Sequence, residues 1–142
     1  MPDDPGRVGD TIEWMARASG DLRAARHVLA AEPPLLEDAM FHCQQSAEKA
    51  FKAFLVWHDQ PFRKTHSIEE VGELCLALDE TLKPHVDRAA PLTEFAWKFR
   101  YPGVAEEPSI EEARAALTTA TDVYDAVLAR LPDEARPPAI GE

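Results

Sequence analysis

The chain has 142 residues, of which 45% are hydrophobic, and a formal net charge of −11. This length favours a single domain with a buried core, and no apolar run approaches the length of a membrane-spanning helix. The acidic first residues lack the apolar segment of a signal peptide, so we expect a cytoplasmic protein without membrane partners. The acidic charge also argues against broad non-specific binding of nucleic acid.

Helical periodicity begins near the N-terminus. Asp10 or Thr11 is a suitable N-cap for a first helix, and Pro33 and Pro34 end it. Residues 1–9 are therefore expected to be a flexible tail. The apolar stripe of this helix contains Trp14, Met15, Ala18, Leu22, Ala25 and Leu29.

A second helix is predicted over residues 36–58, and the rest of the chain is organised around it. One face is a wide apolar stripe made of Met40, Cys43, Ala47, Ala50, Phe51, Phe54 and Trp57. A second row on the other side consists of His42, Gln45, Lys49 and Lys52. Gln44 falls inside the apolar sector and Glu48 lies at its border. Both need partners, because an unpaired buried polar group costs about 1–3 kcal/mol.

The next helix is marked by a capping-box pair, Ser67 with Glu70, and Lys83-Pro84 is expected to end it. A shorter helical segment is predicted from about Pro91 to Phe99.

A second capping-box pair, Ser109 with Glu112, opens a last helix that Pro132 closes. No alternating strand pattern occurs. We therefore predict an all-α fold, an up-and-down helical bundle of four main helices plus a shorter fifth over residues 10–131. Residues 132–142 are expected to be a second flexible tail, and Cys43 and Cys75 to be reduced, buried thiols.

Positive charge is concentrated in one part of the chain. Within residues 42–66, Glu48 and Asp59 stand against Lys49, Lys52, Arg63 and Lys64, whereas the flanking regions are acidic. One interpretation is a solvated helix face that keeps the protein soluble. The other is a site for a phosphate or another anion.

Three short motifs occur in order: His42-x-Gln44-Gln45-x-x-Glu48-Lys49-x-x-Lys52, then Lys64-Thr65-His66, then Arg100-Tyr101-Pro102-Gly103. Together they resemble the HEPN domain family over about residues 10–131. The resemblance implies a helical bundle, commonly a homodimer, from prokaryotic cytoplasm with a nucleotide-related role. It also implies a minimal nucleotidyltransferase as a separate partner chain, whereas other branches of the family are metal-independent ribonucleases that act as toxins.

The ribonuclease branches share an arginine followed four to six residues later by a histidine. Arg100 matches the arginine, but Ala105, Glu106 and Glu107 stand where the histidine would be. An imidazole would exchange protons with the ribose or the leaving group, and glutamates would repel an RNA phosphate. We therefore lean towards a protein that is not an enzyme.

The candidate residues form two groups. The residues predicted to bind a nucleotide or anion are Lys49, Lys52, Lys64, His66, Arg100 and Tyr101. The residues predicted to be structural polar groups are His42, Gln44, Gln45 and Glu48. Glu48 could pair with Lys52 on the helix surface. We expect no metal ion and no cofactor, since the histidines have no close pair at metal-ligand spacing.

The function expected from these features is a non-catalytic nucleotide- or anion-binding HEPN-like module that is homodimeric and acts with a nucleotidyltransferase partner. Two alternatives stay open. One is a metal-independent ribonuclease whose altered site contains Arg100, His66 and Tyr101. The other is a purely structural dimerisation protein, in which leftover apolar surface makes the dimer.

Overall fold

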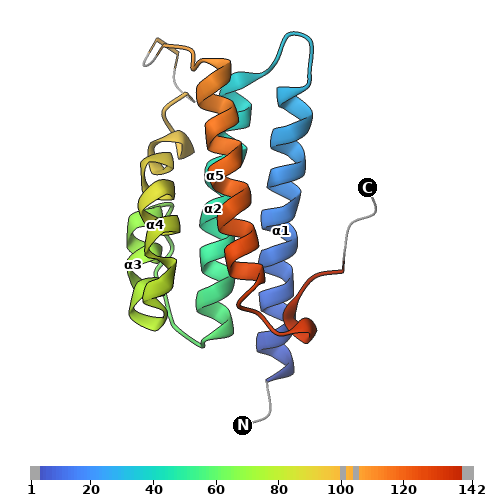
Figure 1. Ribbon diagram of the computed structural model, residues 1–142, viewed down its shortest axis with the longest axis vertical. Helices are drawn as coiled ribbons and strands as arrows, with labels where there is room; N and C mark the ends of the chain where they lie inside the picture. Colours follow the sequence, from blue (N-terminus) through green and yellow to red (C-terminus); the bar gives the residue numbers. More distant parts are fainter. Residues whose placement is uncertain (1–3, 100–101, 104–105, 139–142) are drawn as a thin grey trace.

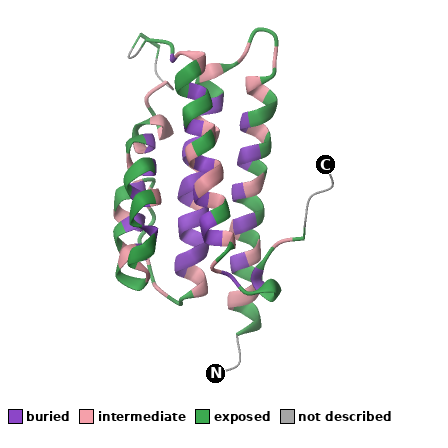
Figure 2. Ribbon diagram, viewed as in Figure 1, coloured by how far each residue is buried: buried purple, intermediate pink, exposed green. Residues whose placement is uncertain are grey.

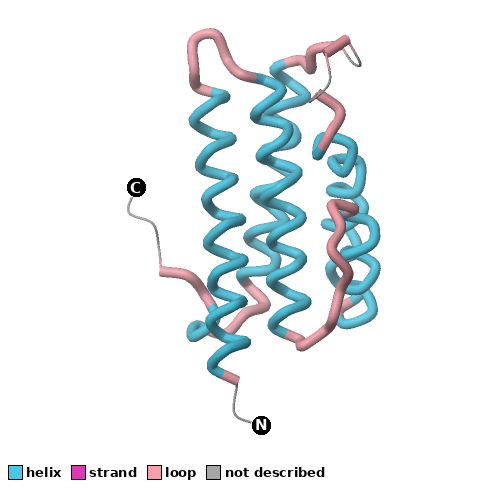
Figure 3. The backbone as a smooth tube through the Cα atoms, turned by 180° about the vertical axis from the view of Figure 1, so that it is seen from behind, coloured by secondary structure: helices cyan, strands magenta, loops and turns pink. Residues whose placement is uncertain are grey.

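The computed structural model describes residues 4–99, 102–103 and 106–138 (Figure 1). Within these residues the chain forms α-helices and short 3₁₀-helices, with no strand. Helix α2 stands at the centre, with α1, α5 and the α3–α4 pair around it. The predicted all-α, up-and-down bundle is confirmed (Figure 3).

Helix α1 spans Pro5–Leu29, so it begins before the predicted start at residue 10 or 11. Asp4 is the N-cap, and its carboxylate accepts a hydrogen bond from the Gly6 amide at 3.0 Å. Proline suits this first turn, because the position needs no amide donor and its φ angle is already helical. The prediction of a flexible tail over residues 1–9 was therefore wrong for residues 5–9.

Helix α2 spans Leu36–Trp57 and is buried around most of its circumference, not on one face alone (Figure 2). The expected stripe residues Phe51 and Phe54 are at most 1% exposed, but Lys52 in the second row is also only 5% exposed. The second row is covered because α1 and the connection to α3 pack over it. Polar side chains of α2 therefore find their partners inside the fold.

Both cysteines are free and buried, as predicted. Burial raises the pKa of the Cys43 thiol to about 12, and it also raises the pKa of the Cys75 thiol. Each thiol therefore stays protonated at neutral pH and packs as a small apolar group.

Helix α3 spans Ile68–Leu78 and begins with Ser67 as its N-cap, but the predicted capping box is only half formed, because the Ser67 amide donates to Oγ1 of Thr65 and the Glu70 carboxylate pairs with Arg63. It ends before Pro84, which lies in the first turn of an additional helix, α4, spanning Lys83–Ala89. The expectation that this proline ends α3 was wrong, because proline is accommodated in the first turn of a helix. The 3₁₀-helices η1 (Glu80–Leu82) and η2 (Ala90–Ala96) flank α4, and η2 forms most of the predicted short segment.

Helix α5 spans Ile110–Leu128, and the predicted capping box of Ser109 with Glu112 is confirmed. A short 3₁₀-helix, η3 (Asp133–Ala135), follows and contacts α1. Ala135 is fully buried, so this part of the predicted tail belongs to the packed structure. Among the described residues, no helix combines the length and apolarity needed to cross a membrane.

The close approach of α3 and α4 generates a stability prediction at Gly72. A Cβ atom added there would lie 2.5 Å from Cγ1 of Val86. We expect Gly72→Ala to lower the free energy of unfolding by about 1–3 kcal/mol, as overpacking does in a dense core. Urea denaturation followed by circular dichroism measures this change.

Gly20 on α1 provides the matched control. A Cβ atom there meets nothing within 4 Å, and the residue is exposed. Gly20→Ala should therefore raise the free energy of unfolding by about 0.5–1 kcal/mol, because alanine is the better helix former. Equal stabilisation by both substitutions would contradict the packing at Gly72.

Candidate functional site

The connection between α2 and α3 is held against α2 by two side chains of that helix. Nζ of Lys52 donates to the backbone carbonyl of Thr65 at 2.8 Å, and Nε2 of Gln44 donates to the carbonyl of His66 at 3.2 Å. The connection is thus attached to α2 at two consecutive residues. These bonds fix where Lys64 and His66 stand on the molecule.

The carboxylate of Glu48 is the centre of this arrangement. Its Oε2 accepts from Nζ of Lys52 at 2.9 Å, and its Oε1 accepts from Nε2 of Gln44 at 2.9 Å. The Glu48 and Lys52 side chains are only 3% and 6% exposed. The i,i+4 pair is therefore present, but the prediction of a pair on the helix surface was wrong.

Two aromatic rings explain why the Lys52 ammonium is buried. Trp14 from α1 and Phe62 from the α2–α3 connection meet edge to face, with ring centroids 6.3 Å apart. Nζ of Lys52 lies 5.5 Å from the Trp14 ring centroid and 5.7 Å from that of Phe62. Both distances are within the range of a cation–π interaction. The rings thus cover the ammonium and exclude water from the ion pair.

His66 is attached through one ring nitrogen and exposed through the rest of its side chain. Its Nδ1 lies 2.9 Å from Oε1 of Glu48, while the side chain is 70% exposed. A carboxylate only accepts hydrogen bonds, so Nδ1 carries the hydrogen in this contact. Nε2 is then the ring nitrogen that remains for a ligand.

A second polar cluster joins α1 to α2 at Asp21. Its carboxylate contacts Nδ1 of His42 at 2.9 Å and accepts from Nζ of Lys49 at 2.7 Å. The Lys49 side chain is 22% exposed, so it reaches solvent only in part. Both predicted residues therefore help to hold the two helices together.

The structure brings together part of the predicted ligand site. Lys52 and His66 meet at Glu48, and Lys64 lies on the same connection, exposed and with no ion pair among the described residues. Lys49 lies on the same helix but is paired with Asp21. The predicted residues Arg100 and Tyr101 fall outside the described residues. The ligand roles stay predictions.

The predicted structural polar residues all have internal partners. Gln44 and Glu48 bond to each other, and Nε2 of Gln45 donates to Oε1 of Gln44 at 2.6 Å. His42 bonds to Asp21. Asp21 itself was missed, although a carboxylate within the Ala18–Leu22–Ala25 stripe signals a buried acid that needs a cationic partner.

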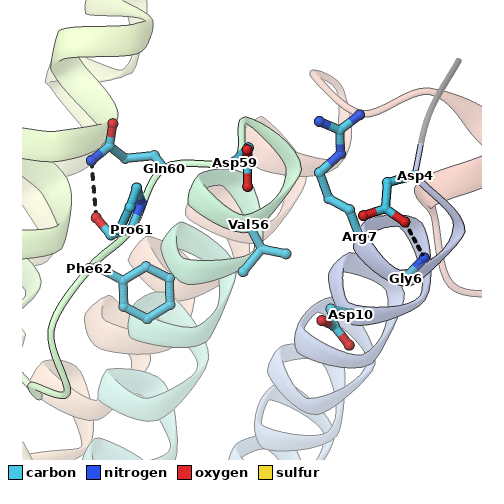
Figure 4. Close-up of a pocket in the computed structure, with 9 residues that line it drawn as sticks. All are labelled: Asp4, Gly6, Arg7, Asp10, Val56, Asp59, Gln60, Pro61 and Phe62. Atoms are coloured by element: carbon cyan, nitrogen blue, oxygen red, sulfur yellow. Dashed lines mark hydrogen bonds between the residues drawn. The ribbon is translucent and has the colours of Figure 1, made fainter. Parts of the chain in front are cut away.

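A hollow of about 520 Å³ lies below this cluster, between the start of α1 and the end of α2 (Figure 4). Phe62 forms one wall, and Arg7 stands on the other with its guanidinium 5.0 Å from the Trp57 ring centroid. The carboxylates that line it are those of Asp4, Asp10 and Asp59. These acids disfavour a phosphate here. No group of three metal-ligating side chains occurs in the described part of the chain.

The buried ion pair generates a second stability prediction. We expect Glu48→Ala to lower the free energy of unfolding by about 3–5 kcal/mol, because the Lys52 ammonium would stay buried without its carboxylate. Urea denaturation measures the loss. The double variant Glu48→Leu/Lys52→Met should recover part of it, since no charge is then left buried.

Glu13→Ala is the control for this prediction. It removes a carboxylate that pairs with Arg17 at the same i,i+4 spacing, but with both side chains more than 60% exposed. Its expected cost is about 0.2–1 kcal/mol. A Glu48→Ala cost within that range would contradict the burial of the pair.

Comparisons with known proteins place this chain in a family. The sequence model of the HEPN domain matches residues 11–131. Among solved structures, that of an archaeal HEPN homologue matches with 25% identity and a TM-score of 0.67, over 84% of this chain and 96% of the other. No curated protein matches the sequence. Because the match spans nearly all of the bundle, the chain belongs to the HEPN domain family.

Proposed function

We propose that this HEPN chain is a non-catalytic module that binds a nucleotide or another anion at the α2–α3 connection. The supporting observation is the attachment of residues 65 and 66 to the buried Glu48–Lys52 pair. This attachment presents the exposed side chains of Lys64 and His66 from a rigid base. A site that is ordered before binding loses less conformational entropy when the ligand arrives.

The contacts of the cations indicate which of them serve the ligand. Lys52 is occupied by Glu48, and Arg63 donates through Nε to the Glu70 carboxylate at 2.8 Å. Lys64 and His66 therefore supply the first contacts to an anion, whereas Lys49 on α2 is paired with Asp21. A lysine ammonium donates charge-assisted hydrogen bonds to phosphate, and a histidine whose Nδ1–H is already bonded to a carboxylate does so through Nε2 in its imidazolium form.

The partner in this proposal is a minimal nucleotidyltransferase on a separate chain, with the HEPN chain as a homodimer. Membership of the family supports this assignment, because small HEPN chains often accompany such enzymes. The net charge of −11 is consistent with a small ligand, since it disfavours the binding of long nucleic acids. A nucleotide carries only a few negative charges, so it can contact the local cations with little repulsion from the rest of the acidic surface.

Isothermal titration calorimetry with ATP and with tripolyphosphate tests the ligand claim. We expect Lys64→Gln/His66→Gln to bind both at least about tenfold more weakly than wild type, a loss of about 1.4 kcal/mol or more. Lys83→Gln removes a lysine from an exposed pair with Asp87 and should leave binding unchanged. Negligible heats for wild type, or equal affinities for all three proteins, would refute the site.

A ribonuclease is the second candidate, and the geometry of His66 is the observation that favours it. A buried carboxylate orients its Nδ1, and the exposed ring leaves Nε2 for proton transfer. This is how a carboxylate supports a histidine that acts as a general acid or base. The missing arginine–histidine motif keeps this function second.

Incubation with end-labelled RNA in the presence of EDTA tests the ribonuclease. The enzyme hypothesis predicts cleavage that His66→Ala reduces by about 10²–10⁴-fold, the usual contribution of general acid–base catalysis. His27→Ala changes an exposed histidine on α1 and serves as the control. No cleavage by wild type, or full cleavage by His66→Ala, would remove this candidate.

A further inference from the structure

The solvent face of α1 carries a second cationic feature, remote in sequence from the α2–α3 connection. A shallow hollow of about 640 Å³ lies on the second half of this helix. Its lining residues are Gly20, Arg23, Ala24, Arg26 and His27. Helix α1 stands at the edge of the bundle, with exposed residues along its outer side (Figure 2). The hollow is therefore open to a partner.

The two arginines of this hollow differ from most cations of the protein. Lysines and arginines elsewhere in the described chain are largely in ion pairs, as Arg88 is with Asp122 and Arg130 with Asp79. Arg23 and Arg26 are exposed, and neither forms an ion pair among the described residues. In a chain of net charge −11, two neighbouring unpaired arginines form a local site for negative charge.

The floor of the hollow is low because Gly20 has no side chain. Nothing in the protein lies within 4 Å of where its Cβ would be, so no internal contact requires glycine there. Glycine in the middle of a helix is unfavourable for folding. Because Gly20 has no side chain, another surface can approach the backbone of α1 closely beside the arginines.

We propose that this hollow docks an acidic segment of a partner protein, with Arg23 and Arg26 binding its carboxylates. A guanidinium matches a carboxylate with two parallel hydrogen bonds. Small-molecule sites enclose most of their ligand, which this open hollow does not do. The net charge disfavours a nucleic acid, whose many phosphates would face the whole acidic surface. The hollow shares no residue with the anion site at the α2–α3 connection, and its occupant does not depend on that site.

Fluorescence anisotropy with a labelled poly-L-glutamate of only about four residues, too short to face the acidic remainder of the surface, tests the docking site. We expect salt-sensitive binding to the full chain that weakens at least about tenfold in Arg23→Gln/Arg26→Gln, because both charge-assisted contacts are lost. The matched control Lys83→Gln/Arg114→Gln removes the same charge from exposed positions elsewhere and should change the affinity less than about twofold.

A third variant, Gly20→Gln, fills the hollow without changing the charge and should also weaken binding. Circular dichroism confirms that each variant is folded. No binding of poly-L-glutamate by wild type would overturn the proposal. An equal loss in the matched control, or unchanged affinity in Gly20→Gln, would do the same. Tighter binding of a single-stranded RNA through the same arginines would identify a nucleic acid as the occupant instead.

Discussion

The buried ion pair of Glu48 with Lys52 ties the α2–α3 connection to the centre of the bundle. Each partner is held by further groups. Gln44 and His66 contact the carboxylate. The ammonium donates to the carbonyl of Thr65 and lies over two aromatic rings. A buried charge without such contacts would lose several kcal/mol of solvation, about as much as a small domain's net stability. The ion pair therefore fixes the position of the α2–α3 connection. The position of the His66 ring at the surface is fixed with it.

Helix α2 can hold this pair because it is surrounded by the other helices. Its apolar stripe packs into the core through Phe51 and Phe54, while Lys49 and His42 meet Asp21 on α1. Polar contacts in a low-dielectric interior are strongly directional, so they fix the register of α1 against α2 more sharply than methyl contacts do. The same residues thus determine both the packing of the bundle and the base of the candidate site.

The periodicity of the sequence was sufficient to predict α1, α2, α3 and α5 and the central position of α2, but not α4, and the Ser67 and Ser109 caps identified two helix starts. An error arose at Pro84, because this proline was interpreted only as a helix breaker. Pro84 lies in the first turn of α4, whose N-cap Leu82 makes no side-chain cap bond that could have signalled it, whereas Asp4 before Pro5 could have indicated the earlier start of α1. The spacing of Glu48 and Lys52 predicted their pairing, but its burial depends on Trp14 and Phe62, which come from distant parts of the chain. Local pattern carries no information on such covering contacts.

In an acidic protein, the cations that are already paired limit where an anion can bind. The basic segment over residues 42–66 suggested one continuous cationic surface, yet Lys49, Lys52 and Arg63 each have a carboxylate partner. An ion pair already made must be broken or shared before either member serves a ligand, so its charge contributes little to binding from outside. The positive potential that remains comes from cations without internal partners. In the described part of the chain these include Lys64 at the α2–α3 connection, Arg114 on α5, and the two neighbouring arginines on the outer face of α1, so an anionic ligand should favour Lys64 beside His66 or the arginine pair.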